Sequence, residues 1–255
     1  MQTQPASRIE PKPRSNLIHP EITRLPRLTI WRRVFRRIII GFVRLLVWLF
    51  TRTHIDGLKN VPRHTPILVV SNHLGDADLV VGMAVSPEPV EVLAKADLYD
   101  YPVLGRLLDA YGVIWVHRGL PDRRALRAAL EGLQQGRLVG IAPEGRESLT
   151  GALEEGIHGA AYLALKAGVP VLPITFTGTE NARIYGNMKH LRRTRVTVTI
   201  GPLFHLDDLP DRRRALQQGT QKVMSVLASQ LPSQYQGVYQ FMANKGVEEQ
   251  DDGGK

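Results

Sequence analysis

The sequence contains no cysteine in 255 residues, which excludes a disulfide scaffold, a thiolate metal site and a catalytic thiol. It also lacks the G-x-S-x-G motif that presents a nucleophilic serine in α/β-hydrolases. Covalent hydrolase chemistry of these two kinds therefore has no nucleophile. No apolar run reaches the ~20 residues of a membrane span, because Arg44 interrupts the most apolar segment near its middle.

Acidic residues are scarce in the N-terminal arm, residues 1–54. This arm contains eleven Lys/Arg and two acids out of 33 and 24 in the whole chain, which leaves 22 of each sign beyond it. The full net charge of +9 therefore lies in the arm. We interpret residues 1–29, which include five prolines, as a disordered basic leader.

Residues 30–54 combine arginines with large apolar side chains at helical spacing, including Trp31, Phe35, Phe42 and Trp48. This pattern favours an amphipathic helix that lies in the interface of an anionic bilayer. Nucleic acid is the rival partner for a basic arm, but a phosphate backbone would gain nothing from the apolar face. A helix packed on the protein with its arginines reaching outward is the structural alternative. We expect a membrane-associated protein on the cytoplasmic face that does not bind nucleic acid.

From residue 55 the chain alternates short apolar runs with helical patterns, which predicts an α/β domain over 55–232 with a mostly parallel sheet flanked by helices. A flexible acidic tail is expected over 233–255. The expected strands are 66–71, 90–95, 112–117, 137–142, 170–176 and 195–201. The expected helices lie near 77–86, 100–110, 122–135, 156–167 and 211–230.

A histidine and a carboxylate stand five residues apart directly after the apolar run 66–70, at His73 and Asp78. Side chains at this end of a strand face the ligand crevice of an open α/β sheet. A carboxylate on one imidazole nitrogen fixes the tautomer and makes the other nitrogen a better base. Asp76 is an alternative partner for the histidine, and Asn72 is a candidate cap for the following helix.

Four blocks in register resemble the glycerolipid acyltransferase family, whose best-known members acylate lysophosphatidic acid. The resemblance covers roughly residues 55–205. The first block matches the family's N-H-x-x-x-x-D signature in full, and the third resembles its P-E-G-[TS]-R motif. The blocks are Asn72–Asp78, the segment from Lys95 to Arg118, Pro143–Arg146 and Val169–Ile174.

The resemblance implies that His73 is the general base and that Asp78 orients it. It also implies that substrate phosphate is bound by residues of the second and third blocks, with a surface charge as the alternative role for each cation. These residues are Lys95, Arg118, Glu144, Gly145 and Arg146. The third block departs from the family, since Arg146 stands at the usual Thr or Ser position and Glu147 at the usual Arg position.

The expected function is acyl transfer from acyl-CoA or acyl carrier protein to the free hydroxyl of 1-acylglycerol 3-phosphate, which gives phosphatidic acid. This chemistry needs a base and an oxyanion-stabilising site but no metal and no cofactor. Two alternatives stay open. One is acylation of another lipid alcohol, such as an ornithine lipid precursor or a different lysophospholipid, and the other is a non-catalytic lipid-binding protein of the same fold.

Overall fold

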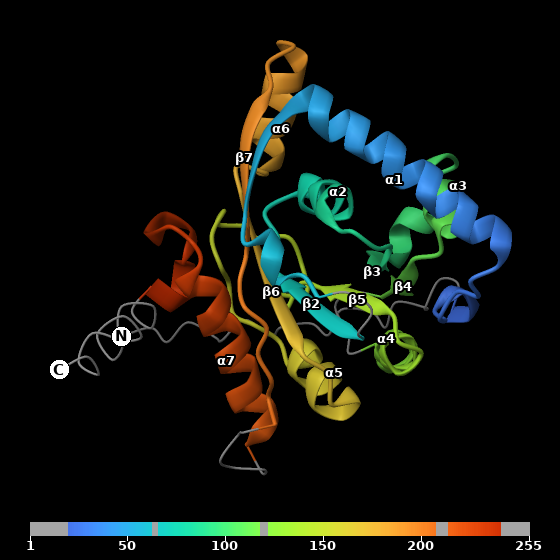
Figure 1. Cartoon of the computed structure of the whole chain (residues 1–255), viewed down its shortest axis with the longest axis vertical. Helices are drawn as coiled ribbons and strands as arrows, with labels where there is room; N and C mark the ends of the chain where they lie inside the picture. Colours follow the sequence, from blue (N-terminus) through green and yellow to red (C-terminus); the bar gives the residue numbers. More distant parts are fainter. Residues whose placement is uncertain (1–19, 63–65, 118–121, 208–213, 241–255) are drawn as a thin grey trace, which may run out of the picture.

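The computed structural model describes residues 20–62, 66–117, 122–207 and 214–240. Within them, seven strands form one sheet in the order β1-β7-β6-β2-β5-β3-β4. Every neighbouring pair is parallel except β6 and β7, so β1 and β7 run opposite to the other five strands. The predicted α/β class with a mostly parallel sheet is confirmed (Figure 1).

The strands lie close to the predicted runs. Their bounds are β1 Thr51–Asp56, β2 Ile67–Ser71, β3 Val90–Lys95, β4 Ile114–Val116, β5 Leu138–Ile141, β6 Val171–Thr177 and β7 Thr194–Ile200.

The helices cover both faces of the sheet, with α1, α2, α3 and α6 on one face and α4, α5 and α7 on the other (Figure 1). Their bounds are α1 Ile30–Phe50, α2 Asp76–Val85, α3 Leu104–Tyr111, α4 Arg123–Gln134, α5 Gly159–Ala167, α6 Asn181–Lys189 and α7 Ala215–Ser229.

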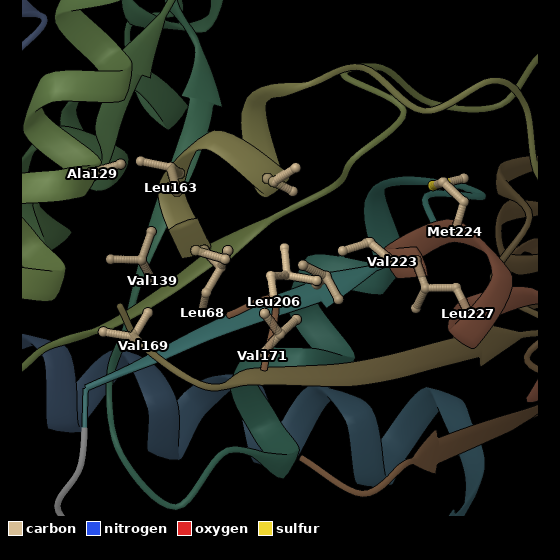
Figure 2. Packing of buried hydrophobic residues seen from close by; sticks show 14 of the residues in the cluster. Leu68, Ala129, Val139, Leu163, Val169, Val171, Leu206, Val223, Met224 and Leu227 are labelled. Atoms are coloured by element: carbon tan, nitrogen blue, oxygen red, sulfur yellow. The ribbon is translucent and has the colours of Figure 1, made fainter. Parts of the chain in front are cut away.

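Successive residues of the central strand β2 point to opposite faces. Leu68 packs with Leu163 and Leu227 in the cluster under α4, α5 and α7, which Figure 2 shows from close by. Ile67 packs instead with Val81 in the cluster under α2 and α6. Because both faces are covered, the strand has an unbroken apolar sequence rather than an alternating one.

Two elements were not expected from the sequence. Strand β1 is polar and lies at the edge of the sheet, and the predicted boundary between residues 54 and 55 falls inside it. Helix α6 buries only Ile184, so its sequence has too weak an apolar face to indicate a helix.

Parts of both predicted disordered ends are ordered, since 20–22 and 233–235 form short 3-10 helices. Residues 1–19 and 241–255 lie outside the described residues.

The arginines of α1 divide between the two sides of the helix. Arg32, Arg36 and Arg44 donate to backbone carbonyls of the domain, whereas Arg33 and Arg37 are exposed. The large apolar side chains divide as well. Phe35 packs against the core, which corrects its expected place on the outer apolar face.

The apolar residues that α1 turns away from the protein define an outer stripe. Trp31 is 83% exposed, Phe42 55% and Trp48 67%. The stripe consists of Trp31, Val34, Ile38, Phe42, Leu45, Trp48 and Leu49. Its spacing of three to four residues keeps these side chains on one side of the helix.

A buried ion pair sets which side of α1 faces the domain. The Arg36 guanidinium donates to both carboxylate oxygens of Glu91, at 2.8 and 2.7 Å, and to the carbonyls of Tyr111 and Gly112. Arg36 is 2% exposed and Glu91 1%. Such a pair fixes orientation more than it stabilises, because taking two charges out of water offsets most of their attraction.

Removing one partner of this pair should be costly. We expect Arg36→Met to lower the free energy of unfolding by about 3–5 kcal/mol, because Glu91 would stay buried with its main counter-charge gone. The double variant Arg36→Met/Glu91→Met should be distinctly more stable than the single one. Urea denaturation of the three proteins measures both effects, and a double variant less stable than the single one would contradict this account.

Candidate active site

His73 lies just beyond the carboxyl end of β2, on the loop that leads to α2. The preceding Asn72 is 1% exposed and makes two hydrogen bonds to Phe176 of β6, accepting its N–H at 2.8 Å and donating to its carbonyl at 2.9 Å. Asn72 thus extends the pairing of β2 with β6 by one step, rather than capping α2 as expected. Gly75 is the residue at the N-cap position.

Asp78, in the first turn of α2, folds back onto the histidine. Its Oδ2 lies 3.0 Å from His73 Nδ1 and accepts the backbone N–H groups of Leu74 and Gly75. A carboxylate only accepts, so Nδ1 carries the hydrogen in this contact and Nε2 is left with its lone pair. The histidine side chain is 19% exposed and that of Asp78 5%, so the imidazole ring is partly accessible while its partner is buried.

Asp76, the alternative partner, is turned elsewhere. Its carboxylate accepts from the Tyr185 hydroxyl of α6 at 2.8 Å, and its N–H donates to the Asn181 side chain. Gly75 makes this approach possible. A Cβ at this position would lie 2.6 Å from Asn181 Oδ1 and 2.7 Å from the Thr179 carbonyl. The loop that carries His73 is thereby tied to the start of α6.

Glu144 links the first block to the third through hydrogen bonds. It is 6% exposed, and its two carboxylate oxygens accept the N–H of His73 at 3.1 Å and that of Glu154 at 2.8 Å. Burial raises the pKa of Glu144 to about 7, against these two hydrogen bonds, which favour the charged form. Both carboxylate oxygens of Glu144 are thus engaged by backbone N–H groups, one of which is that of His73.

The raised pKa gives a test in pH. From about pH 5 to pH 7 the unfolded chain has lost the Glu144 proton while the folded protein retains part of it, so the folded state loses stability as pH rises. Relative to Glu144→Gln, which cannot titrate, the wild type should lose up to about 1.4 kcal/mol per pH unit. Urea denaturation of both proteins at pH 5, 6 and 7 measures the difference, and a constant difference would be inconsistent with a raised pKa.

The other predicted phosphate ligands are distributed around this centre. Lys95 Nζ lies 2.5 Å from Asp97, and Arg146 lies 2.5 Å from Glu154, with both cations about half exposed. Gly145 has a φ of 73° and uses its N–H in a turn to the Ala142 carbonyl. The structure thus pairs these two cations with acids, and Arg118 lies outside the described residues.

Comparison with known proteins identifies the family. A family model described as Acyltransferase matches residues 52–177, which hold His73, Asp78 and Glu144. The chain is 31% identical to a chloroplastic 1-acyl-sn-glycerol-3-phosphate acyltransferase of Brassica napus over 67% of its own length. The chain belongs to the glycerolipid acyltransferase family.

Other members of this family are similarly distant. A chloroplastic 1-acyl-sn-glycerol-3-phosphate acyltransferase of Arabidopsis thaliana is 30% identical over 69% of this chain. The 1-acyl-sn-glycerol-3-phosphate acyltransferase of Borreliella burgdorferi is 28% identical over 54% of this chain. The chain spans about half the length of these relatives, 50% and 57% respectively. The crystal structure of an acyltransferase from Thermotoga maritima has the same fold, with a TM-score of 0.57, 22% identity, and 78% of this chain and 83% of that chain covered.

The departure from the acyltransferase third motif has a structural consequence. Glu147, at the position where the motif has Arg, accepts a hydrogen bond of 2.8 Å from Asn181, the residue that also binds the N–H of Asp76. Asn181 was missed from the sequence, because nothing in a short polar segment between strands marks it as part of a site.

A second histidine–aspartate pair shows that the spacing alone does not identify the candidate base. His117 and Asp122 are also five residues apart, and their Nδ1 and Oδ2 atoms lie 3.1 Å apart. Asp122 Oδ1 accepts the N–H groups of Arg124 and Ala125 and so caps α4. In this acyltransferase, the motifs around His73 rather than the contact itself single out the candidate base.

Two further observations bear on the site. Among the described residues, no three His, Asp or Glu side chains gather as a metal ion would require. No helix in the same part of the chain is long and apolar enough to span a bilayer.

Proposed function

We propose that this protein is a membrane-surface 1-acylglycerol-3-phosphate acyltransferase that makes phosphatidic acid. The observation that carries the proposal is the His73–Asp78 contact at the carboxyl end of β2, with Nε2 left to act as a base. The activities for which the relatives are named support the choice of acceptor.

In the proposed reaction, His73 Nε2 takes the proton of the acceptor hydroxyl as its oxygen attacks the thioester carbonyl of the donor. Asp78 stabilises the imidazolium that forms. When the tetrahedral intermediate collapses, the carbon–sulfur bond breaks, and the leaving thiolate takes the proton from His73. Both substrates are bound together, so no protein side chain is acylated and no cofactor takes part. The donor is acyl-CoA or acyl carrier protein.

The proposed phosphate-binding residues are Lys95, Arg118, Glu144, Gly145 and Arg146, and the three cations among them can pair with the phosphate charge. Arg118→Ala should raise the KM for lysophosphatidic acid about tenfold to a hundredfold, the loss expected for one charge-assisted hydrogen bond, and should leave the donor KM nearly unchanged. Steady-state kinetics with each substrate varied in turn measures this. Equal increases for both substrates would contradict the assignment. Arg146→Ala in the same assay tests the third block, since an unchanged acceptor KM would remove Arg146 from the ligands.

A second acceptor is favoured by one specific observation. Glu147 replaces the arginine of the family motif, and Arg146 is paired with Glu154, so the third block offers phosphate less free positive charge than the motif does. Such a site suits a lipid alcohol whose headgroup is less anionic, such as an ornithine lipid precursor.

The proposed location is the cytoplasmic face of an anionic membrane, with the outer stripe of α1 in the interface. The exposed Arg33 and Arg37 lie on the same helix and can reach lipid phosphates. A nucleic acid would leave the large apolar side chains of the stripe in water, which favours lipid as the partner.

One experiment tests the activity and separates the acceptors. The purified protein is incubated with lysophosphatidic acid, a lyso-ornithine lipid or lysophosphatidylethanolamine, with acyl-CoA and with acyl carrier protein as donors, and the lipids are analysed. We expect phosphatidic acid as the main product. Product from the lyso-ornithine lipid alone would establish the alternative acceptor, and absence of any product would favour the non-catalytic lipid-binding protein.

A further inference from the structure

The turn between α6 and β7 is the most basic part of the chain outside the N-terminal arm. Residues 181–200 contain five Lys/Arg and no acidic residue. Four of these cations and a histidine surround the turn, which we call the basic turn. It consists of Lys189, His190, Leu191, Arg192, Arg193 and Arg195, all of them exposed. The neutral balance of residues 55–255 therefore conceals a local excess of positive charge.

Among the described residues, no carboxylate neutralises the cations of the basic turn. Arg193 donates to the Thr51 carbonyl at 2.8 Å. In the described part of the chain, Lys189, Arg192 and Arg195 have no carboxylate within 4.0 Å. Arg195 also lies beside Arg52 in the register of β7 and β1. Like charges on paired strands are unfavourable unless an anion lies between them, so this surface is suited to bind one.

An apolar side chain stands at the tip of the same turn. Leu191 is 88% exposed and has a φ of +52°, the left-handed conformation that favours glycine or asparagine. It follows the C-cap of α6, where the N–H of Arg192 bonds to the Asn187 carbonyl. Leucine is unfavourable here both for its backbone and for its contact with water. An acidic protein or free anion would account for the arginines but not for this side chain.

The basic turn is continuous with the outer stripe of α1. The Arg193 guanidinium lies 5.9 Å from the centre of the Trp48 ring, near the end of α1. Figure 1 shows the turn beside the point where α1 passes into β1. The two surfaces come from segments about 140 residues apart in the sequence, as the contact between Arg193 and Thr51 shows.

The turn also lies at the same end of the strands as His73. Strand β6 runs parallel to β2, and β7 returns antiparallel to β6 with Thr197 opposite Thr177. Thr194, where β7 begins, therefore lies past the end of β6, on the side where β2 leads into His73. At the other end of α6, Asn181 holds Asp76 and Glu147.

We infer that the basic turn is a second membrane-contact surface, which binds anionic phospholipid headgroups through its arginines while Leu191 enters the interface. This inference rests on the proposed membrane association and adds a second contact to it. A single helix on a bilayer leaves the domain free to swing about it. A second contact, near the C-terminal end of α1, fixes the orientation of the domain. The end of the sheet that carries His73 then faces the lipid that supplies the acceptor.

Vesicle binding of the full chain tests the electrostatic contribution of the arginines to membrane binding. Arg192→Gln/Arg195→Gln should lower the partition coefficient on phosphatidylcholine vesicles that contain phosphatidylglycerol by roughly 25-fold, about fivefold for each charge removed. On phosphatidylcholine alone it should bind like the wild type. The matched control Arg127→Gln/Lys166→Gln removes two exposed charges from α4 and α5 on the other face of the sheet and should keep wild-type binding. Equal losses in the two double variants would overturn the inference.

Leu191→Gly tests the apolar contribution of this side chain to membrane binding without a risk to folding. The variant relieves the left-handed leucine, so its thermal midpoint should equal or exceed that of the wild type, while vesicle partitioning should fall roughly fivefold to tenfold. Unchanged binding would overturn the inference.

Three further outcomes separate the inference from the membrane association it rests on and from a protein partner. If the variants in the basic turn bind normally and Trp31→Ser/Phe42→Ser does not, the inference fails and the role of α1 stands. If neither set changes binding, the proposed membrane association fails. If Arg192→Gln/Arg195→Gln binds vesicles normally but loses turnover only with acyl carrier protein as the donor, the turn docks that acidic protein and the lipid assignment is wrong.

Discussion

Replacing His73 by alanine should lower acyl transfer by about 10²–10⁴-fold, the usual effect of losing a general base. The reason is local: Asp78 holds Nδ1, so Nε2 is the atom placed to take the hydroxyl proton. Asp78→Asn should also lose most activity, because an amide does not hold the same tautomer. Turnover with saturating donor and acceptor in detergent measures both, with circular dichroism to show that the variants are folded.

His117→Ala is the matched control for this prediction. His117 makes the same kind of contact with Asp122 across the same spacing, so the two substitutions remove comparable structural interactions. We expect His117→Ala to keep activity within about tenfold of the wild type, since no base is lost. Near-normal turnover of His73→Ala, or equal losses in the two variants, would refute the assignment of His73 as the base.

Removing the aromatic side chains of the outer stripe should release the protein from vesicles. Trp31→Ser/Phe42→Ser/Trp48→Ser should lower partitioning at least a hundredfold, because each side chain loses an apolar contribution of about 1.5 kcal/mol or more. High salt should release less protein than this variant does. Screening shortens the Debye length to about 3 Å at 1 M salt and weakens the arginine contacts, but it leaves the apolar contacts in place.

A control with the same number of substitutions keeps the interpretation specific. Tyr162→Ser/Leu216→Ser/Val238→Ser removes three large exposed apolar side chains from other surfaces and should bind vesicles like the wild type. Sedimentation of the proteins with vesicles measures all of these. Complete release of the wild type by salt alone would mean that α1 acts as an electrostatic tether, and the interfacial position of the stripe would then be wrong.

The six apolar strands and the polar residues that follow β2 were predictable, because both depend on local sequence. The apolar run 66–70 predicts a buried strand, and His73 and Asp78 are close enough in sequence for a single turn to bring them together. Helix bounds such as Asp76–Val85 were predicted to within one residue for the same reason. Polar edge elements were missed, since β1 and α6 bury too few apolar side chains to leave a periodic signal.

The roles of Glu144 and Asn181 could not be predicted, because each depends on a partner distant in the sequence. Glu144 is 71 residues from His73, and Asn181 is 105 residues from Asp76. A motif places Glu144 near the site but does not say whether its carboxylate meets a ligand or the backbone. The direction of each side chain follows from the packing of β2, β5 and β6 side by side.

The sequence by itself determined the α/β class, the family, the position of the histidine–aspartate pair and the concentration of net charge in residues 1–54. These properties are encoded in apolar periodicity, short motifs and composition, which need no long-range contact. Only the tertiary structure decided which side of α1 faces water, because the roll of the helix is set by the buried pair of Arg36 with Glu91, 55 residues away. It also decided that the basic turn lies beside Trp48, since the pairing of β1 with β7 brings together two segments that no local pattern relates.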